Sequence, residues 1–399
     1  MKKILLITSI YPKPSDNEAT GVCHYFTKEW HQLGYDVRVV HIQSVFPYIF
    51  YWGAKLAGRL IRAKTGAVVY TKADREVVSF NMDGVNITRI PTFKPYPHAA
   101  YPQREIKKVV EKIKSNNDND GFVPDVIVGH FPNPQLEIIN ILKQYYGHTV
   151  KTSMIVHEDY TPTKKLYGKR FETLIKGVDI WGFRSKPLYE SFVKTVGNVE
   201  DMFYCYSGIP ERYLIQKRES FTTTLNHFIF VGSLFKLKKV DVSLKALSQV
   251  FGTESFMFDI VGEGAEMNRL KSLAKNLNIS TNVRFYGNVA RERLQSIVAT
   301  ADCFIMVSAP EAFGLVYLEA MAKGCIVVGS KGQGIDGVII DGYNGFLCEP
   351  DNPNHLADVI RKIRSMSQTE LIEMSNNALD TARKLTDANV AKMYVDSII

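Results

Sequence analysis

The sequence contains few cysteines, and their arrangement excludes several classes of protein. There are five in 399 residues, an odd number, with no Cys-x-x-Cys pair. Neither a disulfide framework nor a zinc site follows from such a pattern. We therefore expect a protein of a reducing compartment, the cytoplasm. The five are Cys23, Cys205, Cys303, Cys325 and Cys348.

Long hydrophobic runs are also absent. No stretch approaches the ~18–20 apolar residues of a transmembrane helix. The chain opens with two lysines before the apolar residues 4–7, which resembles the start of a signal peptide. The run ends at Tyr11-Pro12-Lys13, however, without a small-residue cleavage site. A buried first strand accounts for it better.

The composition lacks the biases of disordered, collagen-like or coiled-coil chains, since 45% of the residues are hydrophobic and 23% are charged. Repeats and low-complexity segments are missing as well. A chain of 399 residues exceeds the usual size of one domain. Two domains are therefore expected.

Excess positive charge is confined to the first half of the chain. Residues 1–208 contain 28 Lys and Arg against 20 Asp and Glu, whereas residues 209–399 contain 21 of each. The whole net charge of +8 thus lies in the first half, which indicates an anionic partner there. A nucleic acid is disfavoured, because no known module with clustered arginines and stacking aromatic residues is present.

Both halves alternate short apolar runs with helical patterns. In the first half we expect a helix at 21–33 and strands at 4–10, 37–40, 85–90, 126–128, 153–156 and 180–183. The pattern restarts after residues 207–210, whose Gly and Pro are typical of a linker. There we expect strands at 228–231, 256–261, 283–286, 304–307 and 326–328, and helices near 240–251, 266–277, 291–301 and 314–323.

This β-α alternation predicts an α/β protein with two Rossmann-like, doubly wound domains built on parallel sheets. We expect them at residues 1–207 and 208–385, with a C-terminal helix at 386–399 that packs back on the first domain. Two such domains would face a central cleft at the carboxyl ends of both sheets, where ligands bind.

The segment 308–322 follows an expected strand and opens an expected helix. A helix start leaves backbone N–H groups unpaired and favours an anion, and Phe313, Gly314 and Leu315 would present such groups. Glu311 and Glu319 are roughly 12 Å apart along a helix. That layout suits a nucleotide-sugar, which has hydroxyls at both ends and phosphates between. The spacing alone is more often that of a helix with an acidic first turn and one exposed glutamate.

Several motifs match one family in order along the chain. SAPEAFGLVYLEAMAKG (308–324) with GYNGFLCEPDNPNHLADVI (342–360) resembles the donor site of glycosyltransferase family 4, the retaining GT-B glycosyltransferases. MKKILLITSIYP and Gly21 resemble its opening strand and glycine loop, and DVIVGHFPNP its acceptor-domain strand. FVGSLFKLKKVD, VGEGAE and FYGNV resemble its donor-domain strand ends. The resemblance covers nearly the whole chain and implies a GT-B hexosyltransferase that uses a nucleotide diphosphate sugar with retention at the anomeric carbon.

The resemblance also implies roles for single residues in the donor domain. Glu319 matches the glutamate that holds the ribose hydroxyls, Glu311 the one that contacts the donor sugar, and Lys238 a diphosphate-binding lysine. Ser233 departs from the family, which commonly has arginine there, and Lys239 or Lys236 would have to compensate. The other donor-binding residues that it implies are Gly21, Gly232, Gly262, Phe313, Gly314 and Leu315. A lysine-rich loop with no such role would simply be solvated.

His130 ends a strand in the first domain. The resemblance makes it the acceptor-domain histidine that reaches the donor sugar or phosphate, and with Glu311 and Lys238 it completes the expected catalytic set. A structural role is the alternative for a histidine at a strand end. His157, which ends the next strand, is the second candidate. Gly21 would bring its amide to the donor phosphates, or simply start a helix.

We expect neither a metal nor a cofactor, because no ligand cluster is visible and GT-B enzymes generally need none. NAD binding is disfavoured, since Met267 stands where G-x-G-x-x-G has its third glycine. The implied mechanism is front-face substitution, in which the leaving phosphate helps to deprotonate the acceptor. The alternative is a sugar-nucleotide-binding GT-B protein, or an epimerase-like enzyme, without transferase activity. The sequence leaves the donor, the acceptor, the linkage and the oligomeric state open.

The stretch 45–64 combines five aromatic residues with four cations, Lys55, Arg59, Arg62 and Lys64. Aromatic residues beside a basic helical face favour peripheral contact with an anionic membrane surface. The acceptor would then be a lipid-linked saccharide, as in capsule, exopolysaccharide or teichuronic-type assembly. The alternative is an internal helix buried in the first domain.

Overall fold

The computed structural model describes all residues except 13–20, 66–70, 73, 216 and 223–224. In a helix at 48–65 it describes the backbone throughout, but not the side chains of residues 56 and 59–65. The chain forms two compact units. Unit 1 comprises Met1–Leu60, Ala67–Ser207 and Asp387–Ile399, and unit 2 comprises Ile61–Gly66 and Gly208–Thr386.

Unit 1 contains an eight-stranded sheet in the order β3-β4-β2-β1-β5-β6-β7-β8. Its strands are β1 (Lys3–Thr8), β2 (Asp36–Val45), β3 (Val78–Met82), β4 (Val85–Phe93), β5 (Val126–His130), β6 (Lys151–Val156), β7 (Ile180–Phe183) and β8 (Met202–Tyr204). Neighbouring strands pair in parallel, with the exception of β3 and β4. This antiparallel hairpin corrects the expectation of a wholly parallel sheet. Asp83 and Gly84 have φ of 52° and 83°, as a tight two-residue hairpin turn requires.

Both faces of this sheet are buried, which explains why β1 is apolar at successive positions. Leu5 and Ile7 belong to a core cluster that includes residues of α3 and α4, whereas Ile4 and Leu6 point to the opposite face and are equally buried. The helices of the first 207 residues are α1 (Val22–Gln32), α2 (Tyr48–Thr65), α3 (Gln103–Asn119), α4 (Gln135–Tyr146), α5 (Thr161–Tyr167), α6 (Phe171–Lys176) and α7 (Lys186–Val196).

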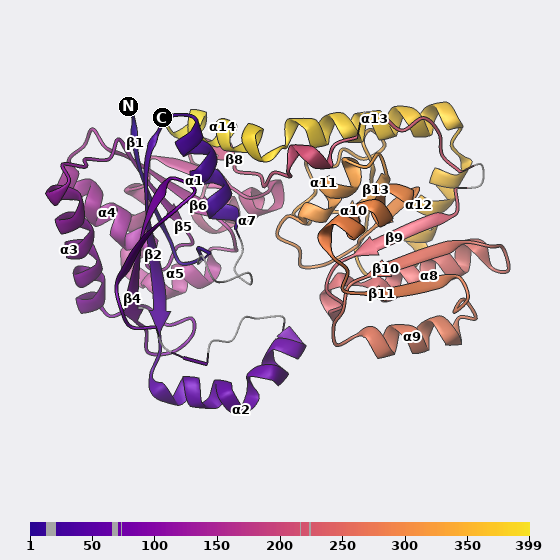
Figure 1. Ribbon diagram of the computed structural model, residues 1–399, viewed down its shortest axis with the longest axis horizontal. Coiled ribbons are helices and arrows are strands. Elements are labelled where there is room, and N and C mark those ends of the chain that lie inside the picture. The colour runs from indigo at the N-terminus through magenta and orange to yellow at the C-terminus, as the bar shows by residue number, and fades with distance from the viewer. Residues whose placement is uncertain (13–20, 66–70, 73, 216, 223–224) are drawn as a thin grey trace. The chain divides into compact units, whose positions relative to one another are not determined.

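The last helix, α14 (Asp387–Ile398), belongs to unit 1 although it follows all of unit 2. It packs against α1, as Figure 1 shows. Trp30 Nε1 donates a hydrogen bond to the carbonyl oxygen of Ala391 at 2.9 Å. The Tyr394 ring lies edge-on to Trp30 and Phe26, with centroid distances of 4.8 and 5.1 Å. Aromatic packing therefore fixes α14 to the first unit.

Unit 2 contains a six-stranded, wholly parallel sheet in the order β11-β10-β9-β12-β13-β14. Its strands are β9 (His227–Val231), β10 (Met257–Val261), β11 (Val283–Gly287), β12 (Cys303–Ile305), β13 (Ile326–Ser330) and β14 (Phe346–Cys348). Its helices are α8 (Val240–Phe251), α9 (Met267–Asn276), α10 (Arg291–Thr300), α11 (Leu315–Met321), α12 (Pro353–Ser365) and α13 (Gln368–Lys384). This 3-2-1-4-5-6 order is that of a Rossmann sheet.

In each sheet the strand order reverses beside the first strand, between β1 and β5 in unit 1 and between β9 and β12 in unit 2. Ligands of such sheets bind outside the carboxyl ends of the strands at this point. The predicted α/β class with two Rossmann-like sheets is confirmed. The fold therefore directs attention to the residues that follow β1 and β5, and to those that follow β9 and β12.

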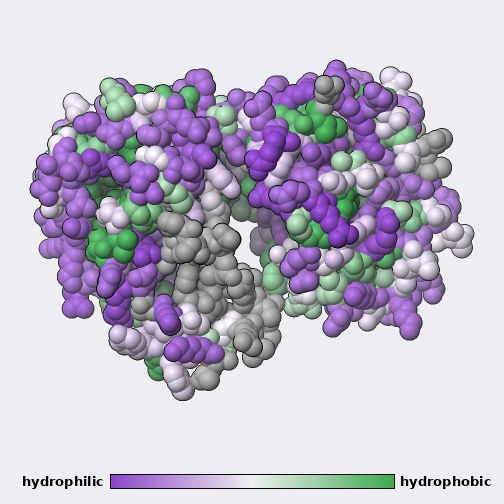
Figure 2. Space-filling model, in the orientation of Figure 1, coloured by the Kyte–Doolittle hydropathy of each residue, from purple (hydrophilic) through white to green (hydrophobic). Residues whose placement is uncertain are grey.

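Hydrophilic residues cover most of the surface in view in Figure 2. Among the helices of the described residues, none combines the length and the apolarity that crossing a bilayer requires.

Candidate functional site

Glu311 and Lys238 form an ion pair in unit 2. Lys238 Nζ lies 2.5 Å from Glu311 Oε2, and Ser308 Oγ donates to the same oxygen at 3.1 Å. Lys238 ends a short 3₁₀ turn after β9, and Glu311 lies on the loop between β12 and α11. Because β9 and β12 are neighbours, the two loops meet at the carboxyl edge of the sheet. Two of the three residues predicted to be catalytic are thus in contact.

The loop that carries Glu311 is held in place by its neighbours. The Glu311 N–H donates to Gln333 Oε1, and the Gly334 N–H donates to the Glu311 carbonyl oxygen, both at 2.9 Å. Gly314 precedes α11 with φ of 78°, and a Cβ there would lie 2.6 Å from the ring of Tyr317. Only glycine fits this position without strain. The loop is therefore a defined structure, with Gln333 as a support that the sequence did not reveal.

Phe313 and Leu315 flank this glycine. The Phe313 side chain is buried, and α11 begins at Leu315 with Gly314 as its N-terminal flanking residue. The predicted helix start is within one residue of the observed one. The backbone N–H groups of residues 313–315 therefore lie at the carboxyl edge of the unit 2 sheet, beside the Glu311 loop.

Glu319 lies one turn into α11 and is buried, with 8% of the residue exposed. Arg291 Nη2 donates to its Oε1 at 3.2 Å, and Gln295 Nε2 donates to its Oε2 at 3.1 Å. Burial raises the pKa of Glu319, and the Arg291 guanidinium opposes that shift. A carboxylate has about four acceptor sites, so each oxygen can still accept a bond from a ligand. Arg291 and Gln295, both on α10, orient this carboxylate and were not predicted.

The predicted glycines after β9 and β10 allow two backbones to touch. The Gly232 N–H donates to the Val261 carbonyl oxygen at 2.9 Å. Gly262 has φ of 134°, and a Cβ there would lie only 2.0 Å from the Gly232 carbonyl oxygen. Ser233 is exposed beside them. Lys239, which was predicted to share the phosphate contacts, pairs with Asp351 at 2.6 Å.

In unit 1, His130 is completely buried, and both of its ring nitrogens have partners. Its Nδ1 lies 3.0 Å from His157 Nε2, and its Nε2 lies 3.1 Å from the Tyr394 hydroxyl oxygen. Burial, followed by the charge of Arg184, lowers the pKa of His130 to about 3, so the ring is neutral. In this arrangement both ring nitrogens of His130 are engaged within unit 1, and its predicted contact with the donor stays a prediction. His157 is the partly exposed member of the pair.

Other polar residues follow the strands of unit 1 and were missed from the sequence. Arg184, directly after β7, is buried and donates from Nη1 to the carbonyl oxygen of Cys205 at 2.8 Å. Lys94 follows β4 and Glu158 follows β6 by two residues. Burial lowers the pKa of Lys94 and raises the pKa of Glu158. Their positions at strand ends could have marked them as candidate site residues. Single charged residues that belong to no motif are common in any sequence, however, so they were not singled out.

Of the other site residues predicted within the first 207 residues, the structure describes the surroundings of Gly21 and Lys55 but not the side chains of the rest. Gly21 directly precedes α1, where a Cβ would lie 3.1 Å from the Tyr25 ring. Lys55 is exposed on α2. The side chains of the other three predicted membrane-contact residues, Arg59, Arg62 and Lys64, lie outside the described ones.

The start of α2 carries exposed apolar side chains, as the membrane hypothesis requires. Tyr48, Ile49 and Trp52 are 66–73% exposed, and Phe50 is 40% exposed. Tyr51 is buried instead, and its hydroxyl oxygen accepts a hydrogen bond of 3.0 Å from the Phe46 N–H in the loop before α2. The alternative of a wholly internal helix does not hold for this first turn.

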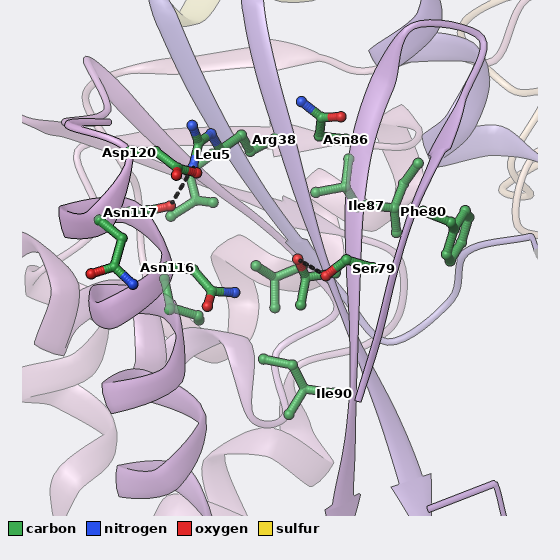
Figure 3. Close-up of a pocket in the computed structure, with 15 residues that line it drawn as sticks. Leu5, Arg38, Ser79, Phe80, Asn86, Ile87, Ile90, Asn116, Asn117 and Asp120 are labelled. Carbon is green, nitrogen blue, oxygen red and sulfur yellow. Dashed lines mark hydrogen bonds and ion pairs between the residues drawn. The ribbon is translucent and has the colours of Figure 1, made fainter. Parts of the chain in front are cut away.

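A hollow of about 450 Å³ opens elsewhere in unit 1 (Figure 3). Arg38 and Asp120 form an ion pair of 2.9 Å at its rim, and the hydroxyls of Ser79 and Thr88 meet at 3.2 Å. It is lined by residues of β1, β2, β3 and β4 and by the second half of α3. His130 ends β5 at the opposite, carboxyl edge of this sheet. The hollow is therefore separate from the candidate site.

The unit 2 residues together suit a ligand with an anionic middle and hydroxyl groups. Lys238 supplies a compact positive charge, and Glu311 and Glu319 supply oriented carboxylate acceptors. In the part of the chain that the structure describes, no three His, Cys, Asp or Glu side chains gather as a metal site would require.

Comparison with known proteins identifies the region that holds these residues. Residues 212–384 match the family model described as Glycosyl transferases group 1. The curated N-acetyl-alpha-D-glucosaminyl L-malate synthase of Bacillus anthracis is 26% identical over 244 residues, which cover 59% of this chain and 64% of that protein. The chain therefore spans less than two thirds of the length of this relative.

Solved structures resemble the whole chain. Anabaena Alr3699/HepE in complex with UDP and glucose superposes with a TM-score of 0.62 at 17% identity, covering 100% of this chain and 99% of that one. The apo form of the lipopolysaccharide outer core galactosyltransferase WaaB gives a TM-score of 0.68 at 17% identity and covers 99% of both chains. Identities this low show the fold alone, which is that of GT-B glycosyltransferase structures.

Proposed function

We propose that this chain, whose residues 212–384 form a Glycosyl transferases group 1 domain, is a retaining glycosyltransferase of family 4. It moves a hexosyl unit from a nucleotide diphosphate sugar to a saccharide acceptor. The observation that carries the proposal is the Lys238–Glu311 pair at the carboxyl edge of the unit 2 sheet, with the buried Glu319 on the following helix. A relative named N-acetyl-alpha-D-glucosaminyl L-malate synthase and a fold neighbour solved with UDP and glucose support a nucleotide-sugar as donor.

Each residue has a defined part in the proposed reaction. Glu319 accepts hydrogen bonds from the ribose hydroxyls, and Lys238 neutralises the diphosphate, assisted by the amides of residues 313–315. Glu311 lies beside the sugar and stabilises the positive charge of the oxocarbenium-like transition state. The bond between the anomeric carbon and the phosphate oxygen breaks while the acceptor oxygen bonds to the same face. The acceptor proton passes to the leaving phosphate, so the proposal requires neither a metal nor a covalent nucleophile.

The donor class is tested by thermal-shift measurements with UDP, GDP and their sugars. We expect one base to raise Tm, because a ligand at 100 times its Kd stabilises the folded state by about 2.7 kcal/mol. NAD serves as a matched control, since it has a diphosphate and two riboses but is not expected to bind. No shift with any nucleotide diphosphate would contradict the proposal.

We further propose that the acceptor is lipid-linked and that the enzyme works at the inner face of the cell membrane in surface-polysaccharide assembly. The support is the exposed turn with Tyr48, Ile49, Phe50 and Trp52, followed by Lys55 on the same helix. Aromatic residues at the interface and cations facing anionic lipids are a common way to bind a membrane surface. A fold neighbour named as a lipopolysaccharide galactosyltransferase is in keeping with such an acceptor.

Membrane contact predicts a large effect of charge reversal on α2. Replacing Arg59, Arg62 and Lys64 with Glu should abolish sedimentation with anionic liposomes, since each cation near the surface contributes about 1 kcal/mol. Trp52→Ala should weaken binding without changing the charge. Lys107, Lys108 and Lys112 on α3, replaced in the same way, provide the control for net charge. Unchanged partitioning of the α2 variant would refute the membrane proposal and leave the donor site unaffected.

A second candidate function remains because of Ser233. Where the family commonly has an arginine, this exposed serine can donate one hydrogen bond but no charge. A protein that binds a nucleotide-sugar without transferring it, or an epimerase-like enzyme, would fit weaker stabilisation of the leaving group. Release of free sugar or of an epimer, without formation of a glycoside, would favour this second function.

A further inference from the structure

Three aromatic side chains form a hydrogen-bonded chain at the carboxyl edge of the unit 1 sheet. The Tyr394 hydroxyl oxygen lies 3.1 Å from His130 Nε2, and His130 Nδ1 lies 3.0 Å from His157 Nε2. Tyr394 is 1% exposed and His130 is 0% exposed, whereas His157 is partly exposed. The hydrogen bonds therefore lead from the buried Tyr394 on α14 to the edge where ligands of such sheets bind.

The positions of the hydrogens follow from the partners that are present. His130 is the one hydrogen-bond partner of the Tyr394 hydroxyl among the described residues. A buried O–H without an acceptor costs about 1–3 kcal/mol, so this hydroxyl donates to His130 Nε2. The neutral His130 must then carry its proton on Nδ1 and donate it to His157 Nε2. Burial, followed by the neighbouring His130 and the charge of Arg184, keeps the pKa of His157 well below its usual value. His157 is therefore neutral and carries its proton on Nδ1.

Aromatic packing holds the hydrogen-bonded side chains of Tyr394, His130 and His157 in place. The Tyr394 ring lies against Trp30, Phe26 and Phe203, with centroid distances of 4.8 to 5.1 Å. The His157 ring stacks on Phe131 at 4.1 Å, with the two planes 17° apart. Phe131 has φ of 68°, an uncommon value for an aromatic residue that directs its ring toward His157. The histidine pair is thus oriented from both ends.

We propose that Tyr394 is a positioning residue that selects the tautomer of His130, and through it makes the Nδ1–H of His157 a hydrogen-bond donor for a ligand at the carboxyl edge of the unit 1 sheet. His157 then takes the part that the sequence resemblance gave to His130. The identity of the ligand, a sugar or diphosphate, rests on the proposed function. The tautomers themselves do not depend on it.

The test is nuclear magnetic resonance of ¹⁵N-histidine-labelled protein, with long-range ¹H–¹⁵N correlations that distinguish the two ring nitrogens. His130→Gln and His157→Gln variants assign the signals. We expect both rings to be protonated on Nδ1 and to show no titration between about pH 5 and 8, where an ordinary histidine changes charge. A proton on Nε2 of His130 in the unmodified protein would overturn the proposal.

Tyr394→Phe removes one oxygen and leaves the ring packing intact. Without the O–H donor, neither tautomer of His130 is favoured, so we expect both histidines to show mixed tautomers. Tyr145→Phe, an exposed tyrosine on α4, is the control and should leave the spectrum unchanged. A single unaltered tautomer in Tyr394→Phe would also overturn the proposal.

Added UDP or GDP separates this inference from the proposed function. The bound nucleotide or nucleotide-sugar should shift the Nδ1 signal of His157 more than either signal of His130. A response confined to His130 would overturn the assignment of His157. No response to any nucleotide would count against the proposed function, whereas the tautomers measured without ligand still decide the role of Tyr394.

Discussion

Replacing Glu311 with Ala should lower kcat by about 100- to 1,000-fold and change donor affinity only a few-fold. The magnitude is that of removing one preorganised electrostatic group from an active site. Glu311 is fixed by Lys238, Ser308 and Gln333 before any ligand binds, so its charge stabilises the transition state without reorganisation. Initial rates of nucleotide release in the presence of acceptor, measured over a range of donor concentrations, separate kcat from KM.

Two further variants show whether charge or shape is responsible. Glu311→Gln keeps the shape but cannot pair with the Lys238 ammonium group, so it should lose nearly as much activity as Glu311→Ala. Glu373→Ala, an exposed position on α13 in the same unit, should behave like the unmodified protein. A Glu311→Ala variant with an unchanged kcat would remove Glu311 from the mechanism.

Glu319→Ala should weaken binding of the nucleotide diphosphate by roughly 10- to 100-fold. Hydrogen bonds to a charged group contribute about 1.5–3 kcal/mol, and tenfold in affinity corresponds to about 1.4 kcal/mol. The carboxylate is already oriented by Arg291 and Gln295, so its loss removes bonds that need no rearrangement. Calorimetric titration with UDP or GDP, whichever stabilises the protein, measures the change directly.

The same experiment has a pH dependence with a defined sign. Burial raises the pKa of Glu319, and only its ionised form accepts bonds at both oxygens. Nucleotide affinity should therefore fall as the pH drops through that raised pKa, and this part of the fall should be absent in Glu319→Ala. If Glu319→Ala and the unmodified protein bound the nucleotide with equal affinity, Glu319 would not be the residue that binds the ribose.

Local sequence patterns predicted much of the fold. Apolar runs marked most of the parallel strands to within a few residues, because a strand buried on both faces must be apolar throughout. The α3 helix was not predicted, although it shows the helical period at Ile106, Val109, Val110 and Ile113. The hairpin β3–β4 was harder to see, since β3 is a partly exposed edge strand without a clear apolar pattern.

The candidate site was predictable only as far as its motifs reach. The resemblance named Glu311, Glu319 and Lys238, and their placement on loops and a helix at the strand ends agrees with the structure. That Lys238 pairs with Glu311, 73 residues away, depends on β9 and β12 being neighbours. Contact between Tyr394 and His130 spans 264 residues and depends on the return of α14 to unit 1. No local pattern carries such information.

The position of α14 also has a consequence for biosynthesis. Residues 387–398, which form α14, are translated after the whole of unit 2. The aromatic surface around Trp30, which α14 covers in the folded protein, therefore stays exposed while residues 208–386 are synthesised. At ~5–20 residues per second this delay is roughly 10–35 s. During that time the nascent first unit exposes an apolar face that chaperones can bind, and the docking of α14 on α1 completes its core.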